Sequence, residues 1–363
     1  MGLISRVSLD RDSRALIIDL SEPYKFIVNL PHQPNKARSI IFKHVSKDFN
    51  CSNLEVFYKS VRSKLNREES IVFLTAANIE EYLHITDNDL EVIATVGLEI
   101  PVCPGSYPID RFRPSTINIA VLLNHPLSDC GLLDLFKTIT EAKSLAATEL
   151  SLRCNHRSPG TVTDAIAVGR PVSLNPSIDF AGMATSIGGR VASIIYSSLV
   201  KYGLSKMGLN GFISSNLGLD LESIIDITMR AYSQAPIPGV DEGRVKSIVE
   251  NILKDVLLDP NVQAIIVAAR ELDLHASIGS IPSISVDDFK SDSARIIADE
   301  LLASALSLYI AGFRGLLGTY WVERLKTQGL INAKLPVFED DILSAIVGST
   351  LSILYSRMGG RFE

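Results

Sequence analysis

The spacing of hydrophobic residues changes near residue 202 of this 363-residue chain. Before that point, short apolar or alternating runs typical of strands are interleaved with helical segments, whereas after it the apolar spacing is helical throughout. The change predicts a mixed α/β domain over residues 1–205 and an all-α helical domain over residues 219–363. A stretch rich in Gly, Ser and Asn over residues 206–218 is interpreted as the linker between them.

The predicted elements follow from these patterns. Short strands are predicted over residues 14–30, and further strands over 37–42, 70–76, 90–96, 116–123 and 165–168. Helices are predicted over 53–65 and 79–83. Two more helices are predicted, one that begins at Asp129 and one that ends at Tyr196. In the second half, helices are predicted over 219–232, 242–258, 262–274, 293–313 and 340–358. The helix over 293–313 is apolar on nearly every side, which predicts that it is the central helix of its domain.

Polar residues cluster after the predicted strand over 116–123. Asn124 ends the strand, and Ser128 and Asp129 are suited to cap the next helix. Lys143 falls on the apolar face of that helix, while Glu141 points the other way. Lys143 either packs its stem on the core and extends its ammonium group to water, or directs a cation into a site at the strand end.

Two acidic pairs stand out in the helical half. Asp299 and Glu300 lie within the most apolar helix, and Asp340 and Asp341 begin the last one. A buried salt bridge, to Arg295 or Arg314, would explain the first pair, and helix capping would explain the second. The alternative is that all four carboxylates bind Mg²⁺, a hard cation that prefers carboxylate oxygens and substrate phosphate.

Composition narrows the function classes. The net charge is −6, and Lys and Arg form no run interleaved with aromatic residues, which argues against nucleic-acid binding and favours a small-molecule substrate. We expect no redox cofactor. The composition is compatible with a homo-oligomer. We interpret the four scattered cysteines as free thiols in a cytoplasmic protein. No segment is expected to span a membrane.

Residues 70–200 resemble the adenosylcobinamide amidohydrolase family, which removes aminopropanol from adenosylcobinamide to give adenosylcobyric acid. The matching motifs are T-I-N-I-A-V-L-L-N-H-P-L-S-D at 116–129, T-E-A-K at 140–143 and G-T-V-T-D-A-I at 160–166. The family pattern A-G-x-H-T-K-x-G is altered, with Ala184 and Ser186 in place of its His and Lys. A corrinoid-binding domain without hydrolytic activity is therefore a second hypothesis for this half.

Residues 219–358 resemble the α-ribazole phosphatase family, which is itself similar to phosphatidylglycerophosphatase A. The matching motifs are P-I-P-G-V at 236–240, I-A-D-E-L at 297–301, Y-I-A-G-F-R-G at 309–315 and F-E-D-D at 338–341. Together the two resemblances imply a bifunctional protein of cobamide (vitamin B12) synthesis and salvage, with a corrinoid and α-ribazole phosphate as substrates. A phosphatase acting on a lipid phosphate is the alternative for this half.

Residue roles follow from what each reaction needs. Amide hydrolysis needs a base, donors to the oxyanion and a proton for the leaving amine. Phosphate-ester hydrolysis needs a metal and a cation. The candidate catalytic residues are Asp129, Glu141, Lys143, Asp164, Asp299 and Arg314. Candidate substrate-binding residues are Asn118, Asn124, Ser128, Thr161 and Thr163, and candidate Mg²⁺ ligands are Asp299, Glu300, Asp340 and Asp341.

Overall fold

The structure, a computed structural model, describes residues 2–105, 115–291 and 296–359. It contains two compact units, residues 1–205 and 206–363, and each is described by itself. The first is mixed α/β and the second is helical, as the hydrophobic periodicity predicts.

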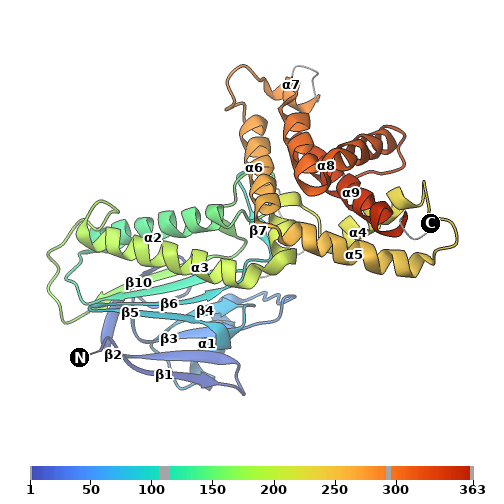
Figure 1. The fold of residues 1–363 in the computed structure, drawn as a ribbon. Helices are drawn as coiled ribbons and strands as arrows, with labels where there is room; N and C mark the ends of the chain where they lie inside the picture. The colour runs from blue at the N-terminus through green and yellow to red at the C-terminus, as the bar shows by residue number, and fades with distance from the viewer. Residues whose placement is uncertain (1, 106–114, 292–295, 360–363) are drawn as a thin grey trace. The chain divides into compact units, whose positions relative to one another are not determined.

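The first unit is built on one mixed sheet of eight strands (Figure 1). Its strand order is β4-β3-β2-β10-β8-β6-β5, with β1 added beside β2, and only the pairs β3–β4 and β8–β10 are parallel. The strands are β1 (Ile4–Asp10), β2 (Ala15–Val28), β3 (Lys36–His44), β4 (Ser70–Thr75), β5 (Leu83–Asp87), β6 (Leu90–Val96), β8 (Ile117–Leu123) and β10 (Ala165–Pro171). A separate two-stranded sheet pairs β7 (Pro101–Val102) with β9 (Gly160–Thr161).

Helices cover this sheet on both sides. In Figure 1, α2 (Asp129–Glu149) and the first part of α3 (Ser186–Leu217) lie over β10, β6 and β5. Their apolar faces pack with one face of β6, β8 and β10 in a single core cluster. The opposite face of these strands packs with β2, β3 and β4, and α1 (Leu54–Lys64) covers the far side of those strands. β8 is therefore buried on both faces, which explains its continuous apolar sequence.

The second unit is a group of helices around one apolar core. They are α4 (Leu221–Tyr232), α5 (Glu242–Leu258), α6 (Pro260–Ser277), α7 (Val286–Lys290), α8 (Ala298–Thr327) and α9 (Val337–Gly359). α9 packs against α4, α5, α6 and α8. It is therefore α9 that is central. The predicted central role of residues 293–313 is wrong, because Leu301 and Leu308 are 64% and 48% exposed.

α8 folds back on itself in the middle. Ala311 and Gly312 leave the helical conformation, and Gly312 has a φ of 61°, which glycine adopts without strain. The hydroxyls of Ser307 and Thr319 are 2.7 Å apart, whereas in a straight helix twelve residues span about 18 Å. α8 is therefore a helical hairpin. Its second half crosses α9 with the backbones in contact, since a Cβ on Gly318 would lie 2.3 Å from the Gly348 carbonyl oxygen.

Three further expectations need correction. Residues 206–217 are helical apart from Gly208, so the predicted linker is part of α3. α8 is long and apolar enough by length and composition to cross a membrane, so the prediction that no segment passes this test is wrong. Each half of the hairpin is only about 20 Å long, shorter than the bilayer core of about 30 Å. Finally, Cys103 and Cys154 form a disulfide and are not free thiols.

Candidate functional site

The predicted polar residues at the end of β8 do gather at one edge of the sheet. Ser128 caps α2 by accepting a hydrogen bond from the Gly131 N–H (3.2 Å), and it donates to Asp179 (2.5 Å). Asp129 is exposed and pairs with Lys25 at 2.5 Å, while Asn124 is exposed at the strand end. Carboxyl ends of parallel strands are where α/β proteins commonly bind ligands.

The same edge holds a charged group that we call the His125 cluster: His125, Asp89, Asp87 and Arg190. Asp89 lies in the turn between β5 and β6, and its carbonyl accepts from the Asn124 N–H at 2.9 Å. One Asp89 carboxylate oxygen contacts His125 Nε2 and the other accepts from Arg190. The side chains of His125, Asp89 and Arg190 are 24%, 31% and 33% exposed, so water and a substrate can reach them.

The electrostatics of this cluster favour a charged carboxylate. Burial alone would raise the pKa of Asp89, but hydrogen bonding from Arg190 and the charge of His125 hold that pKa below its ordinary value. Asp89 therefore stays ionised, and one of its carboxylate oxygens lies against His125 Nε2 as an ion-pair contact. Nδ1 of His125 accepts no hydrogen bond from any described residue. An imidazole of this kind is the usual general base of hydrolases.

Sequence reasoning missed three of these residues and undervalued the fourth. His125 lies inside the T-I-N-I-A-V-L-L-N-H-P-L-S-D motif, where the pattern indicates only the end of a strand. Asp89 and Arg190 are brought to it by the β5–β6 turn and by α3. A polar turn residue beside His125 could be suspected only once the pairing of β6 with β8 is known.

Four predicted residues lie instead near the amino-terminal ends of β8 and β10. Lys143 and Asp164 form a buried ion pair, in which their side chains are 8% and 11% exposed. Asp164 also accepts from the N–H groups of Ile117 (2.9 Å) and Thr161 (3.1 Å) and from the Thr161 hydroxyl (2.5 Å). The Thr163 hydroxyl donates to the Ser115 carbonyl at 3.0 Å. The ammonium group of Lys143 therefore does not extend to water.

This arrangement is suited to holding the fold together. Four donors surround the carboxylate of Asp164, which leaves little of it accessible to a substrate. Asn118 is also enclosed: it is 1% exposed and donates to the Leu74 carbonyl at 2.8 Å. A Cβ on Gly160 would lie 2.1 Å from Asp164 and 2.5 Å from Lys143, so only glycine leaves room for the pair.

The predicted amidohydrolase residues are thus divided between two places. Asp129 and Lys143 are fourteen residues apart on α2, about 21 Å along the helix. Glu141 is exposed on the opposite side of α2 from Lys143. The prediction that one site joins Lys143 with Asn124, Ser128 and Asp129 is therefore wrong, because α2 carries them to opposite ends of β8.

In the helical unit the hairpin brings three predicted acids together. One carboxylate oxygen each from Asp299, Glu300 and Asp341 lies within 4.8 Å of the others, and we call these residues the acidic cluster. Asp299 and Glu300 are in the first turn of α8, not in its middle as the pattern suggested. Oδ1 of Asp299 is buried and accepts no hydrogen bond from a described residue. Such an oxygen is free to bind a cation.

The acidic cluster has perturbed pKa values. Burial, and then the neighbouring Glu300, raise the pKa of Asp299 to about 7. Burial, and then the charge of Glu323, raise the pKa of Asp341 to about 8, with Asp299 and Glu300 adding to the effect. Three acids this close repel one another unless they share protons or a cation.

Two predicted members do not join the cluster. Asp340 instead contacts the ammonium group of Lys326, which also lies 2.8 Å from Glu323. Arg314 is at the other end of the hairpin, where it donates to Ser356, about 22 Å along α9 from Asp341. Its predicted role beside the acids is therefore wrong in this structure, and Lys326 is the nearby cation. Arg295, the other suggested partner of Asp299, lies outside the described residues.

α6 fixes the start of α9 beside the acidic cluster. The buried carboxylate of Asp273 accepts from the N–H groups of Phe338 (3.0 Å) and Glu339 (2.9 Å). Arg270 and Glu339, which are 6% and 0% exposed, form an ion pair at 3.2 Å. These buried contacts orient the first turn of α9 and hence the carboxylate of Asp341.

Comparison with known proteins identifies the family. Residues 2–210 match the adenosylcobinamide amidohydrolase family, which is more than half of the chain. The chain belongs to this family.

Three known proteins are similar to parts of this chain. The adenosylcobinamide amidohydrolase of Methanosarcina mazei is 29% identical over 182 residues, which are 48% of this chain and 86% of that protein. An uncharacterized protein of Methanocaldococcus jannaschii is 24% identical over 161 residues, 43% of this chain and 60% of its own length. The low temperature requirement C protein of Listeria monocytogenes matches 42% of this chain and 94% of its own with 19% identity and a TM-score of 0.34.

The match to the amidohydrolase family covers the His125 cluster and the Lys143–Asp164 pair but not the acidic cluster. Ala184 lies two residues before α3, and Ser186 is the first residue of that helix. Ser186 lies four residues before Arg190, which places the two on one side of the helix. Ser186 is therefore on the same face of α3 as Arg190 of the His125 cluster.

Proposed function

We propose that the first unit hydrolyses the amide that links aminopropanol to the corrin ring of adenosylcobinamide, and that the His125 cluster is its catalytic site. The observation that carries this proposal is the partly exposed His125 ring, in ion-pair contact through Nε2 with an ionised Asp89, at the carboxyl-terminal edge of β8. The buried Lys143–Asp164 pair lacks a free acceptor and supports the fold.

The reaction needs one proton carrier. In the proposed mechanism, His125 Nδ1 takes a proton from water as the water oxygen attacks the amide carbonyl carbon. The exposed amide of Asn124 donates to the oxygen that becomes negatively charged. When the C–N bond breaks, the His125 imidazolium returns its proton to the leaving amine, which departs as aminopropanol. Asp89 stabilises the imidazolium, and Arg190 keeps Asp89 ionised.

Replacing His125 by glutamine is expected to lower the rate of adenosylcobinamide hydrolysis by about a hundredfold or more, because it removes the base. Release of aminopropanol and adenosylcobyric acid, followed by mass spectrometry, measures this. A matched control is His84→Gln, since His84 forms a similar pair with Glu91 (2.5 Å) on the neighbouring hairpin and should be dispensable. Equal loss in both variants would argue against His125 as the base.

The same assay tests the second hypothesis for this unit. If Ala184 and Ser186 have abolished hydrolysis, the wild-type protein will bind adenosylcobinamide and release no aminopropanol. Restoring the family residues with Ala184→His and Ser186→Lys would then be expected to produce turnover. Turnover by the unaltered chain excludes the binding-only hypothesis.

For the helical unit we propose a Mg²⁺-dependent phosphatase that acts on α-ribazole phosphate. The supporting observation is the acidic cluster with its unpaired, buried Asp299 oxygen. Asp299, Glu300 and Asp341 offer the hard oxygen ligands that Mg²⁺ prefers. Bound Mg²⁺ would polarise the phosphoryl group. Lys326 carries a positive charge beside the cluster, because Asp340 and Glu323 raise its pKa against the effect of burial.

Magnesium is expected to stabilise the protein more at about pH 8 than at about pH 5. Since Asp299 and Asp341 have pKa values raised to about 7 and about 8, the folded protein keeps protons that the unfolded chain has already lost. Without metal, stability should therefore fall as pH rises from about 4 to about 8. Mg²⁺ competes with those protons. Melting curves with and without Mg²⁺ at both pH values measure this; a pH-independent response would contradict it.

A lipid phosphate is the alternative substrate for this unit. The observation that favours this alternative is the set of exposed apolar side chains on α8, among them Phe313, which is 68% exposed. Phosphate release from α-ribazole phosphate and from phosphatidylglycerophosphate, compared under the same conditions, distinguishes the two. We expect the soluble substrate to be preferred, because neither half of the α8 hairpin can cross a bilayer.

A further inference from the structure

The helical unit has a hollow at the end opposite to the acidic cluster. It has a volume of about 370 Å³ and lies where the second half of α8 crosses the end of α9. Its polar side is formed by Arg314, Ser352 and Ser356, and its apolar side by Leu317, Trp321 and Tyr355. A smaller hollow of about 240 Å³ adjoins it, sharing the same three polar residues. We call the two together the Arg314 hollow.

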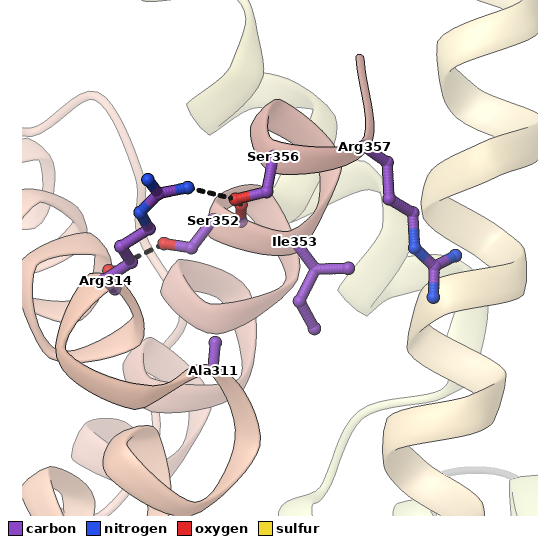
Figure 2. A pocket seen from close by; sticks show the side chains of 6 residues that line it. All are labelled: Ala311, Arg314, Ser352, Ile353, Ser356 and Arg357. Atoms are coloured by element: carbon purple, nitrogen blue, oxygen red, sulfur yellow. Dashed lines mark hydrogen bonds between the residues drawn. The ribbon is translucent and has the colours of Figure 1, made fainter. Parts of the chain in front are cut away.

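Arg314 is held in position but is not neutralised. Its Nη1 donates to Ser356 Oγ at 3.0 Å, and its own carbonyl accepts from Ser352 Oγ at 2.8 Å. Figure 2 shows the guanidinium group and the Ser356 hydroxyl pointing toward each other, with Arg357 directed away on the other side of α9. Among the residues that the structure describes, none forms an ion pair with Arg314. A fixed guanidinium group with spare donors, next to two hydroxyls, is well suited to bind phosphate.

The other side of the hollow offers flat aromatic surface. Trp321 is the only tryptophan of the chain. Tyr355 is fixed, since its hydroxyl donates to the Ala235 carbonyl at 2.8 Å and its ring stacks on Tyr232 at 6.3 Å between centroids. Gly318 also lines the hollow, and its backbone packs against the Gly348 carbonyl of α9. Aromatic side chains of this kind stack on planar rings.

We propose that the Arg314 hollow binds a small molecule in which a planar aromatic ring is joined to a phosphate group, as in a nucleoside monophosphate. Its volume is at the lower end of the range for ligand pockets, about 300–1,000 Å³, which suits one such molecule and is too small for a corrinoid. Ser356 lies about 22 Å along α9 from Asp341, so this site is separate from the acidic cluster and does not depend on phosphatase activity.

The single tryptophan makes the test specific. The full chain is titrated with AMP without Mg²⁺, and Trp321 fluorescence is followed under excitation that AMP does not absorb. We expect a saturable change, with adenosine alone and inorganic phosphate alone each binding at least about tenfold more weakly, because each offers half of the contacts. No saturable change with AMP, or equal affinity for adenosine, would overturn the proposal.

Two variants connect the signal to Arg314. Arg314→Gln is expected to weaken AMP binding by about tenfold or more, since it removes charge-assisted hydrogen bonds. Arg324→Gln is the matched control, because Arg324 is an exposed arginine on the same half of α8 outside the hollow. Both variants should melt at the wild-type temperature, since both side chains are exposed. If the two variants bind AMP equally well, the hollow is not a phosphate site.

Discussion

Replacing Lys143 by methionine is expected to lower the free energy of unfolding of the first unit by about 3–5 kcal/mol. Methionine fills the volume of the lysine stem but leaves the buried Asp164 carboxylate without its cation. The expected result is therefore a loss of stability, which urea unfolding of the full chain measures.

A surface lysine on the same helix provides the control. Lys137→Met breaks an exposed pair with Asp134 (2.6 Å) and should change stability by no more than about 1 kcal/mol. Adding Asp164→Asn to Lys143→Met should recover part of the loss, because it removes the unpaired charge. If Lys143→Met unfolds like the wild type yet no longer releases aminopropanol, Lys143 takes part in the reaction and our assignment is wrong.

Replacing Asp299 by asparagine is expected to lower phosphate release from α-ribazole phosphate by at least about a thousandfold, as several kcal/mol of metal-ion stabilisation are lost. Asparagine keeps the shape of the side chain but removes the charge that would hold Mg²⁺. Adenosylcobinamide hydrolysis should be unchanged, because the His125 cluster lies in the other unit. The two assays are run on the same preparation.

Asp340→Asn is the informative comparison. Asp340 is next to Asp341 in sequence but contacts Lys326 and not the acidic cluster, so this variant should keep most of its Mg²⁺-dependent stabilisation. Equal loss in the two variants would restore the four-acid site that the sequence predicts. Full phosphatase activity in Asp299→Asn would show that Asp299 is structural.

Local patterns predicted the elements well where a segment is regular and its ends are marked. The strand over 90–96 and the helix over 242–258 have the same bounds in the structure, because the first is a continuous apolar run and the second begins after the capping residue Asp241. The hairpin in α8 could not be predicted, because helical periodicity continues on both sides of Gly312 and a single glycine does not distinguish a bend from a tolerated residue.

The candidate sites show a similar limit. Asp299, Glu300 and Asp341 could be grouped from sequence because an acid in an apolar helix needs a partner. Arg314 could not be excluded from that group without knowing which way α8 turns. Likewise, the apolar face of α2 correctly placed Lys143 inside the protein, but the identity of its partner depends on the parallel pairing of β8 with β10. The sequence therefore indicates which side chains belong to a candidate site, but not which of them lie within contact distance of one another.

The break at Ala311 and Gly312 also affects the order in which the chain recovers its structure after denaturation. The two halves of α8 and the start of α9 are neighbours along the chain, so the acidic cluster needs only short loops to close. The sheet instead pairs β2 with β10, which are far apart in sequence. Contacts between distant segments form slowly. We therefore expect the α8–α9 region to refold before the eight-stranded sheet, and the acidic cluster to be complete while the His125 cluster is still being assembled.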